Sequence, residues 1–260
     1  MRLWSNADMA ESGTEARPPL LQADAALYLD FDGTLATFAP HPDGVTVHDS
    51  LPALLAGLRE RLSGAVALVT GRSLAALDSL TGFSSYAAAG LHGHEWRLAS
   101  GHPVSAENPV GARRIVQALR ERFGNDDRLV IEDKGAAAAL HFRRAPERAE
   151  ECIAVMREFA SAEFEVLLGH QVVEARPHGA DKGAALRALA GHPPFRGRRP
   201  AFVGDDVTDE DGFRAAADLG GYGVKVGAGP TAARYRMATV EDVHGWLAAS
   251  LAALGQEAAP

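Results

Sequence analysis

The alternation of apolar and polar positions predicts a sheet of parallel strands with helices between them. Four short runs contain few polar residues, which is typical of strands that are buried on both faces of a parallel sheet. Stretches with helical spacing lie between or after several of these runs, and a doubly wound α/β domain has this order. The strands are expected at 25–31, 65–71, 86–93 and 200–206, and the helices at 49–63, 182–191 and 209–220. An apolar stripe from Val240 to Leu254 predicts a last helix that packs on the core.

Residues 108–177 depart from this order. They contain the pattern helix, strand, strand twice, with Gly135 and Gly169 at the two expected hairpin turns. This pattern predicts a small insert in which helices cover an antiparallel sheet. We therefore expect a lid or cap domain of α+β type at 108–177, a catalytic core at 24–107 plus 178–255, and a disordered N-terminal tail at 1–23.

Composition and charge narrow the class of protein. The 260 residues include 47% hydrophobic and 23% charged residues, as in an ordinary globular protein. With 26 basic and 34 acidic residues the net charge is -8, which argues against a nucleic-acid partner or an anionic membrane surface. One cysteine, Cys152, excludes an internal disulfide framework. No apolar run approaches the length of a membrane span, and the N-terminus lacks a signal pattern, so a soluble, cytoplasmic protein is expected.

The stretch LYLDFDGTLA places two carboxylates at the end of the first strand. Asp30 and Asp32 are two residues apart and share one face of an extended chain. Because parallel strands end at the same edge of a sheet, the polar residues that follow the other strands should join them there. A hard cation such as Mg2+ would relieve the repulsion between so many acids. The polar residues expected to meet at this edge of the sheet are Asp30, Asp32, Thr70, Arg72, Asp205, Asp206, Asp209 and Glu210.

Each part of this pattern also has a structural explanation. An isolated pair of aspartates is common in turns, and the acidic run after Gly204 suits the first turn of a helix. Lys182 stands at the start of a predicted helix, where the helix dipole favours an anion and disfavours a lysine. This position favours a role in anion binding for Lys182, although an exposed lysine remains an alternative.

Four motifs occur in the order of those in haloacid-dehalogenase-like phosphatases: DFDGTLA, VTGR, the segment around Lys182, and GDDVTDEDGF. The trehalose-6-phosphate phosphatases resemble the chain further, in GLHGHEWR, IEDKGAAAALHFR and VVEARPHGADKGAAL. The resemblance covers roughly residues 25–250.

This resemblance implies a role for each motif. Asp30 would attack phosphorus, and Asp32 would protonate the leaving sugar oxygen and then activate a water. Phosphate would be bound by Gly33, Thr70, Gly71, Arg72 and Lys182. Mg2+ would be held by the Asp30 carboxylate, the Asp32 carbonyl and Asp205, with Asp206 or Asp209 acting through water.

The insert would act as a lid that selects the substrate. Charged residues recur on its expected strands, and paired acids and bases suit the many hydroxyls of a disaccharide. The resemblance implies that Glu132, Lys134 and Glu174 bind the sugar, with His141 and Arg143 beside them. Cross-strand ion pairs on a solvated face are the alternative. His92 and His94 are interpreted as lining the site or as structural, and 223–229 as a Gly-rich turn.

The sequence thus favours a Mg2+-dependent phosphatase that acts on a small sugar phosphate, trehalose 6-phosphate, and that is linked in function to a trehalose-6-phosphate synthase. Alternatives are phosphatases of sucrose 6-phosphate or mannosyl-3-phosphoglycerate, a phosphohexomutase, and a non-catalytic sugar-phosphate sensor. A sensor has no need of both Asp30 and Asp32, which disfavours it.

Overall fold

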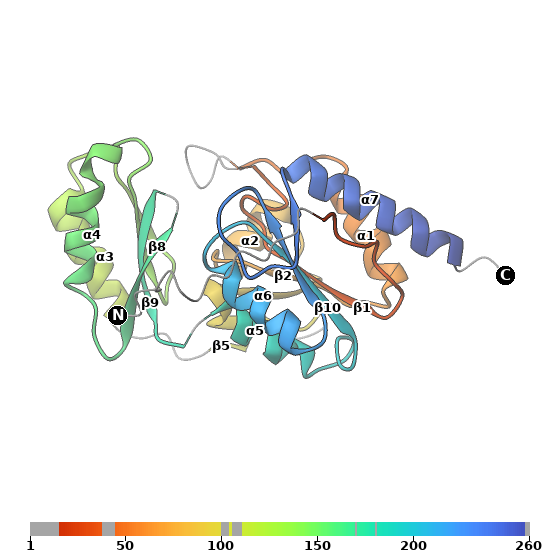
Figure 1. Ribbon diagram of the computed structural model, residues 1–260. Helices are drawn as coiled ribbons and strands as arrows, with labels where there is room; N and C mark the ends of the chain where they lie inside the picture. The colour runs from red at the N-terminus through yellow and green to blue at the C-terminus, as the bar shows by residue number, and fades with distance from the viewer. Residues whose placement is uncertain are drawn as a thin grey trace. The chain divides into compact units, whose positions relative to one another are not determined.

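The computed structural model describes residues 16–37, 45–99, 104–105, 111–169, 171–179 and 181–257. The chain divides into two compact units (Figure 1). Of the described residues, the first unit contains 16–37, 45–69 and 182–257, and the second contains 70–99, 104–105, 111–169, 171–179 and 181. Separate core and lid domains with the boundaries expected above remain a prediction.

A parallel sheet forms the centre of the first unit. Its described strands lie in the order β12-β11-β10-β1-β2. Leu29 pairs with Val203 on one side and Leu68 on the other, so β1, β2 and β10 end at the same edge. Every residue of β1 and β2 is buried, as expected for strands covered on both faces. The strands are β1 (Ala25–Leu29), β2 (Val66–Val69), β10 (Arg199–Gly204), β11 (Tyr222–Val226) and β12 (Tyr235–Met237).

Two pairs of helices pack with this sheet. Helix α1 (Leu51–Arg61) contacts α7 (Val240–Glu257), and α5 (Lys182–Ala190) contacts α6 (Asp209–Asp218) (Figure 1). The expected doubly wound α/β fold is confirmed. Among the described residues, no helix combines the length and the apolar character that a membrane span requires.

Part of the N-terminal segment packs against α7. Leu21 is buried, and its amide donates to Ser250 Oγ over 3.2 Å. Trp246 Nε1 donates to the Pro19 carbonyl over 3.0 Å. These contacts hold residues 19–21 on the helix, whereas residues 1–15 of the expected tail lie outside the described residues.

The interpretation of 223–229 as a turn is wrong for its first half. Residues 222–226 form β11, paired with β10 through Val203 and Val224. Lys225 interrupts the apolar pattern of this strand, but its buried ammonium donates to the Asp205 carbonyl. This contact makes a lysine compatible with a buried strand.

The second unit begins with α2 (Leu74–Thr81) and the antiparallel strands β3 (Ala87–Gly90), β4 (Glu95–Arg97) and β5 (Val104–Ser105). Arg97 fixes this region from a buried position. It forms a bidentate ion pair with Asp78, with both distances 2.6 Å, and donates to the carbonyls of Phe83 and Tyr86. Its role is therefore structural.

A four-stranded antiparallel sheet in the order β6-β7-β9-β8 completes the second unit. Its alternating side chains divide into an apolar and a charged face. Leu140, Val173 and Ala175 lie on the apolar face, which packs against α3 and α4 (Figure 1). The expected antiparallel sheet is confirmed. These elements are β6 (Val130–Asp133), β7 (Ala138–His141), β8 (Phe164–Gly169), β9 (Val172–Pro177), α3 (Gly111–Phe123) and α4 (Ala149–Arg157).

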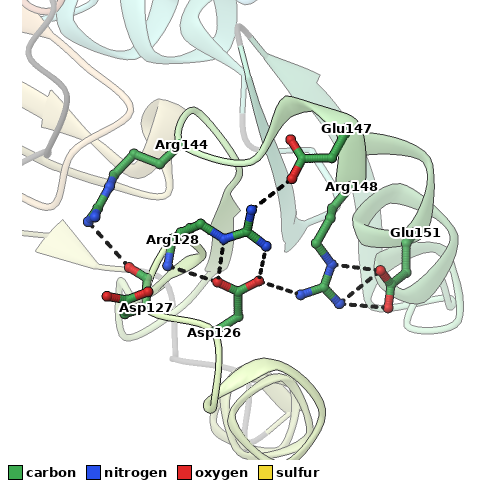
Figure 2. Close-up of polar contacts among 7 residues, drawn as sticks. All are labelled: Asp126, Asp127, Arg128, Arg144, Glu147, Arg148 and Glu151. Carbon is green, nitrogen blue, oxygen red and sulfur yellow. Dashed lines mark hydrogen bonds and ion pairs between the residues drawn. The ribbon is translucent and has the colours of Figure 1, made fainter.

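Ion pairs connect the loop after α3 to the short helix η3 (Pro146–Arg148) before α4 (Figure 2). The Asp126 carboxylate accepts from Arg128 and from Arg148, each at 2.8 Å, and the Arg148 guanidinium lies over the Phe123 ring. Hydrogen bonds from these two arginines hold the pKa of Asp126 well below its usual value. Because the pairs are solvent-accessible and mutually satisfied, we interpret them as structural.

Candidate active site

The loop after β1 places the first carboxylate. Asp30 is buried, and its amide donates to the Val203 carbonyl over 2.9 Å. The chain then turns tightly, with the amides of Leu35 and Ala36 both donating to the Phe31 carbonyl. Gly33 has φ 81°, and a Cβ built there would lie 2.2 Å from Asp205 Oδ2. Only glycine allows this loop to approach Asp205 so closely.

Three carboxylates meet at this edge of the sheet. Single oxygen atoms of Asp30, Asp205 and Asp209 all lie within 4.8 Å of one another. Burial, and then the charge of Asp209, raise the pKa of Asp205 to about 7. Burial also raises the pKa of Asp30 well above its usual value, although the charge of Lys182 opposes this shift. The cluster therefore requires positive charge.

Lys182 supplies part of that charge. It is the first residue of α5 and is buried, and its Nζ donates to Asp30 Oδ1 and to Asp209 Oδ1, both over 2.7 Å. Burial alone would lower the pKa of Lys182, but the charges of Asp209 and Asp30 raise it above its usual value. The lysine is thus a fixed cation beside Asp30, and the exposed alternative is excluded.

Asp209 organises the second acidic loop. Its side chain is fully buried, and its Oδ2 accepts from the amides of Asp205 and Asp206 over 2.9 and 2.8 Å. With Oδ1 bound to Lys182, both oxygens already have donors. Asp209 is the first residue of α6, where a carboxylate interacts favourably with the helix dipole. Its side chain has a further role, because it also binds the amides of the preceding loop.

The residues of this cluster fit a divalent cation. Asp205 Oδ1 is buried, and within the described residues no group hydrogen-bonds to it. An orphaned carboxylate oxygen beside a second buried carboxylate is the donor set that Mg2+ prefers. Asp209 and Lys225 both hydrogen-bond to the backbone of Asp205 and hold its loop. The role of Lys225 was not expected from the sequence, because residues 223–229 were interpreted as a turn.

The remaining acids of the two loops differ in position. Asp32 and Asp206 are half-buried, and neither belongs to the group of three oxygens found among the described residues. Glu210 is buried and accepts from the Ala232 amide over 2.7 Å, which gives it a structural partner away from Asp30.

The predicted phosphate residues of the second unit form one short segment. Thr70 is buried, and its Oγ accepts from the Arg72 amide over 3.1 Å. Thr70 also accepts, through its carbonyl, from the amide of His92 over 3.1 Å. That Thr70, Gly71 and Arg72 surround the same phosphate as Asp30 remains a prediction.

Charged side chains gather on the face of the antiparallel sheet opposite α3 and α4. Glu132 pairs with Ala139 and Ala139 with Glu174 across neighbouring strands, so the small alanine lies between two carboxylates. Lys134 Nζ lies 2.5 Å from Glu174 Oε2, and His141 Nε2 lies 2.8 Å from Glu132 Oε2. Arg143 is half-buried shortly after β7.

The pKa directions on this face follow from these pairs. Burial alone would raise the pKa of Glu174, but Lys134 and then His92 hold it well below its usual value. The pKa of Glu132 is also lowered, because the His141 hydrogen bond and the Lys134 charge outweigh burial. Both acids are therefore ionised at neutral pH, so each can accept hydrogen bonds from a ligand.

A parallel sheet with buried carboxylates at its carboxyl edge, together with an antiparallel sheet, is the fold of solved phosphatases of the haloacid-dehalogenase superfamily. A solved phosphatase of that superfamily, BT1666 from Bacteroides thetaiotaomicron, has this fold, with a TM-score of 0.58 and 20% identity over 88% of this chain and 94% of its own. A trehalose-6-phosphate phosphatase related protein of known structure is more similar, with a TM-score of 0.72 and 26% identity over 89% and 99% of the two chains.

Sequence comparison identifies the family. The trehalose-phosphatase family model matches residues 28–241. The trehalose-6-phosphate phosphatase of Escherichia coli (strain K12) is 40% identical over 253 residues, which are 96% of this chain and 94% of the relative. The chain belongs to the trehalose-phosphatase family and is a phosphoric monoester hydrolase.

Proposed function

We propose that this enzyme hydrolyses trehalose 6-phosphate to trehalose and phosphate through a phosphorylated Asp30, with Mg2+ as cofactor. The observation that carries the proposal is the buried Asp30 carboxylate, held by Lys182 in a cluster with Asp205 and Asp209. It supports a covalent mechanism because a buried carboxylate beside a fixed cation is an activated nucleophile for an anionic phosphoryl group.

In the first step an oxygen of Asp30 forms a bond to phosphorus while the bond from phosphorus to the sugar oxygen breaks. Asp32 gives its proton to that leaving oxygen, which departs as trehalose. Lys182 lies 2.7 Å from Asp30 Oδ1, so its charge opposes the repulsion between the carboxylate and the incoming phosphate.

In the second step a water attacks the same phosphorus. Asp32, now a carboxylate, takes a proton from that water, the bond between phosphorus and Asp30 breaks, and phosphate leaves. Asp32 is half-buried, and its exposure is compatible with exchange of protons with substrate and water.

The ion would be bound by the Asp30 and Asp205 carboxylates and by the Asp32 carbonyl, with Asp206 contributing through water. When bound, Mg2+ would neutralise charge on the transferring phosphoryl group. Asp209 is assigned a supporting role, because both of its oxygens already accept from Lys182 and from two loop amides.

The charged face of the antiparallel sheet would bind the sugar. Glu132, Lys134 and Glu174 are partly or fully buried there and form ion pairs that sugar hydroxyls would join or replace. His141 would orient Glu132, to which it is hydrogen-bonded, and Arg143 would border the same face. A cytoplasmic location and a working link to a trehalose-6-phosphate synthase remain predictions from the sequence.

Phosphate release from a panel of sugar phosphates tests the substrate. The highest kcat/KM is expected for trehalose 6-phosphate, with sucrose 6-phosphate, mannosyl-3-phosphoglycerate and glucose 6-phosphate as competitors. A higher value for any competitor would contradict the proposal, and isomerised sugar phosphate without free phosphate would indicate a mutase instead.

Alanine at Glu132, Lys134 or Glu174 is expected to lower kcat/KM for trehalose 6-phosphate by about ten- to a hundred-fold, because each loses a hydrogen bond to a charged group. p-Nitrophenyl phosphate offers no sugar hydroxyls, so its turnover should change far less. Lys182→Ala should impair both substrates, since both contain the phosphate.

Glu165→Ala provides the matched control for this series. Glu165 is an ion-paired carboxylate on β8 of the same sheet, 2.9 Å from Arg176, and is not assigned to the sugar site. Parallel loss of both activities in the three variants, or an equal loss in the control, would show that these ion pairs are structural.

A further inference from the structure

A strained turn follows β3. Leu91 and His92 have φ of 49° and 57°, in the left-handed region that residues other than glycine rarely occupy. Two hydrogen bonds hold the turn: Leu91 N donates to the Arg72 carbonyl over 2.9 Å, and His92 N donates to the Thr70 carbonyl over 3.1 Å. Such backbone strain persists only where the surroundings impose it, and it is concentrated at functional sites. These hydrogen bonds connect the turn at Leu91 and His92 to residues 70–72, the segment expected to bind phosphate.

The imidazole of His92 packs directly on Gly71. A Cβ built at Gly71 would lie 2.7 Å from Cε1 and 2.8 Å from Nε2 of the ring. Any side chain at position 71 would therefore displace the histidine. The glycine leaves room for the ring, which is almost fully buried.

His92 also faces the proposed sugar-binding carboxylate. Its Nε2 lies 3.6 Å from Glu174 Oε1, while Lys134 binds the other oxygen, Oε2, over 2.5 Å. Lys134 donates in addition to the Gly71 carbonyl over 3.1 Å. Gly71, Lys134, Glu174 and His92 therefore form a closed ring of contacts within the second unit.

Burial and the charge of Glu174 shift the pKa of His92 in opposite directions. Burial lowers the pKa of His92 more than Glu174 raises it, and the charges of Lys134 and Arg176 act in the same direction as burial. A neutral imidazole can carry its proton on Nε2 and donate it to a carboxylate. Within the described residues no hydrogen bond reaches His92 Nδ1, and none reaches Glu174 Oε1, because His92 Nε2 lies 3.6 Å from that oxygen, just beyond hydrogen-bond distance. Arg97 differs, since Asp78 and two carbonyls satisfy its guanidinium. A purely structural histidine would be expected to have its polar atoms paired.

We propose that His92 is a positioning residue for sugar selection: it orients the Glu174 carboxylate from the Oε1 side while packing on Gly71. This inference rests on the proposed function, because it presumes that Glu174 binds sugar hydroxyls. His92 thereby joins the sugar-binding face to the phosphate segment, and it acts on the substrate only through Glu174.

A double-mutant cycle between His92 and Glu174 tests the proposal. Asparagine tolerates a left-handed backbone, but its side chain is too short to place an amide where His92 Nε2 lies, beside Glu174. The longer side chain of glutamine keeps an amide donor near that place. H92N is expected to lower kcat/KM for trehalose 6-phosphate about ten-fold, mainly through KM, and to affect p-nitrophenyl phosphate much less. H92Q should recover part of the loss. In the E174Q background, H92N should cause little further loss, because the carboxylate it orients is already gone.

Two results would overturn the proposal. One is additivity of H92N and E174Q; the other is an equal loss, or no loss, for both substrates. If H92N does not fold, as judged by its melting curve, H92G takes its place, since glycine suits φ 57°. The cycle uses the sugar phosphate with the highest kcat/KM in the panel, so a different preferred sugar would reject the proposed substrate and still test His92. Turnover of no sugar phosphate would reject both.

Discussion

Asp30→Asn is expected to lower turnover by at least about a thousand-fold with the fold intact, because an amide cannot form the bond to phosphorus. The folded chain should tolerate the change well. Burial disfavours the charged form of Asp30 and raises its pKa, so a neutral amide of the same shape should not lower the melting temperature of the metal-free protein. Lys182 keeps its second partner, Asp209.

The measurement is phosphate release together with a thermal melt of both proteins. Asp24→Asn is the matched control, since Asp24 is an exposed aspartate directly before the same strand. Near wild-type turnover in the Asp30 variant, with a normal melting curve, would exclude Asp30 as the nucleophile. A thiol or hydroxyl elsewhere would then have to be sought.

Removal of divalent cations with EDTA is expected to abolish activity, and added Mg2+ should restore it. The oxygens of Asp30, Asp205 and Asp209 lie close together. Among the described residues, Lys182 is the only side chain that forms ion pairs with this cluster. Ca2+ should restore little activity, because its larger and looser coordination changes the position of the attacking oxygen. Full activity in excess EDTA after extensive dialysis would contradict this role of the metal.

The affinity for Mg2+ should also depend on pH. In the metal-free protein the pKa of Asp205 is about 7. Since the ion requires the carboxylate form, a proton competes with it below this pH and not above it. The dissociation constant should therefore rise as pH falls from 8 to 6, by up to about ten-fold per unit below the pKa. Calorimetric titration at the two pH values measures this, and equal constants would argue against Asp205 as a ligand.

Three strands of the first sheet, β1, β2 and β10, were predictable because a continuous apolar run is typical of a strand that is buried on both faces. The run expected at 25–31 forms β1 over Ala25–Leu29, and the run at 200–206 forms β10 over Arg199–Gly204. The antiparallel sheet was predictable from the repeated pattern of residues 108–177, in which alternating side chains flank hairpin turns. Helix α3 spans Gly111–Phe123 and buries one face of five apolar residues.

Elements with a mixed pattern were missed. Strand β11 contains Gly223 and Lys225 in its five residues, and both are atypical of a buried strand. The lysine is tolerated because the Asp205 carbonyl is within its reach, a contact that exists only when β10 and β11 are adjacent. The residues around 223–229 do not indicate that β10 lies beside them, so they were interpreted as a turn.

The sequence alone predicted that acids at the ends of parallel strands would meet at one edge of the sheet, and the structure brings together three of the six expected acids, Asp30, Asp205 and Asp209. Only the tertiary structure decided their partners. Lys182 binds Asp30 across 152 residues of chain, and Lys134 binds Glu174 across 40. The same structure assigned Asp209 to the support of a loop and brought His92 beside Glu174. The physical reason is that ion pairs and hydrogen bonds act over a few ångströms, and separations on that scale are set by strand order, register and loop conformation rather than by the local pattern of residues.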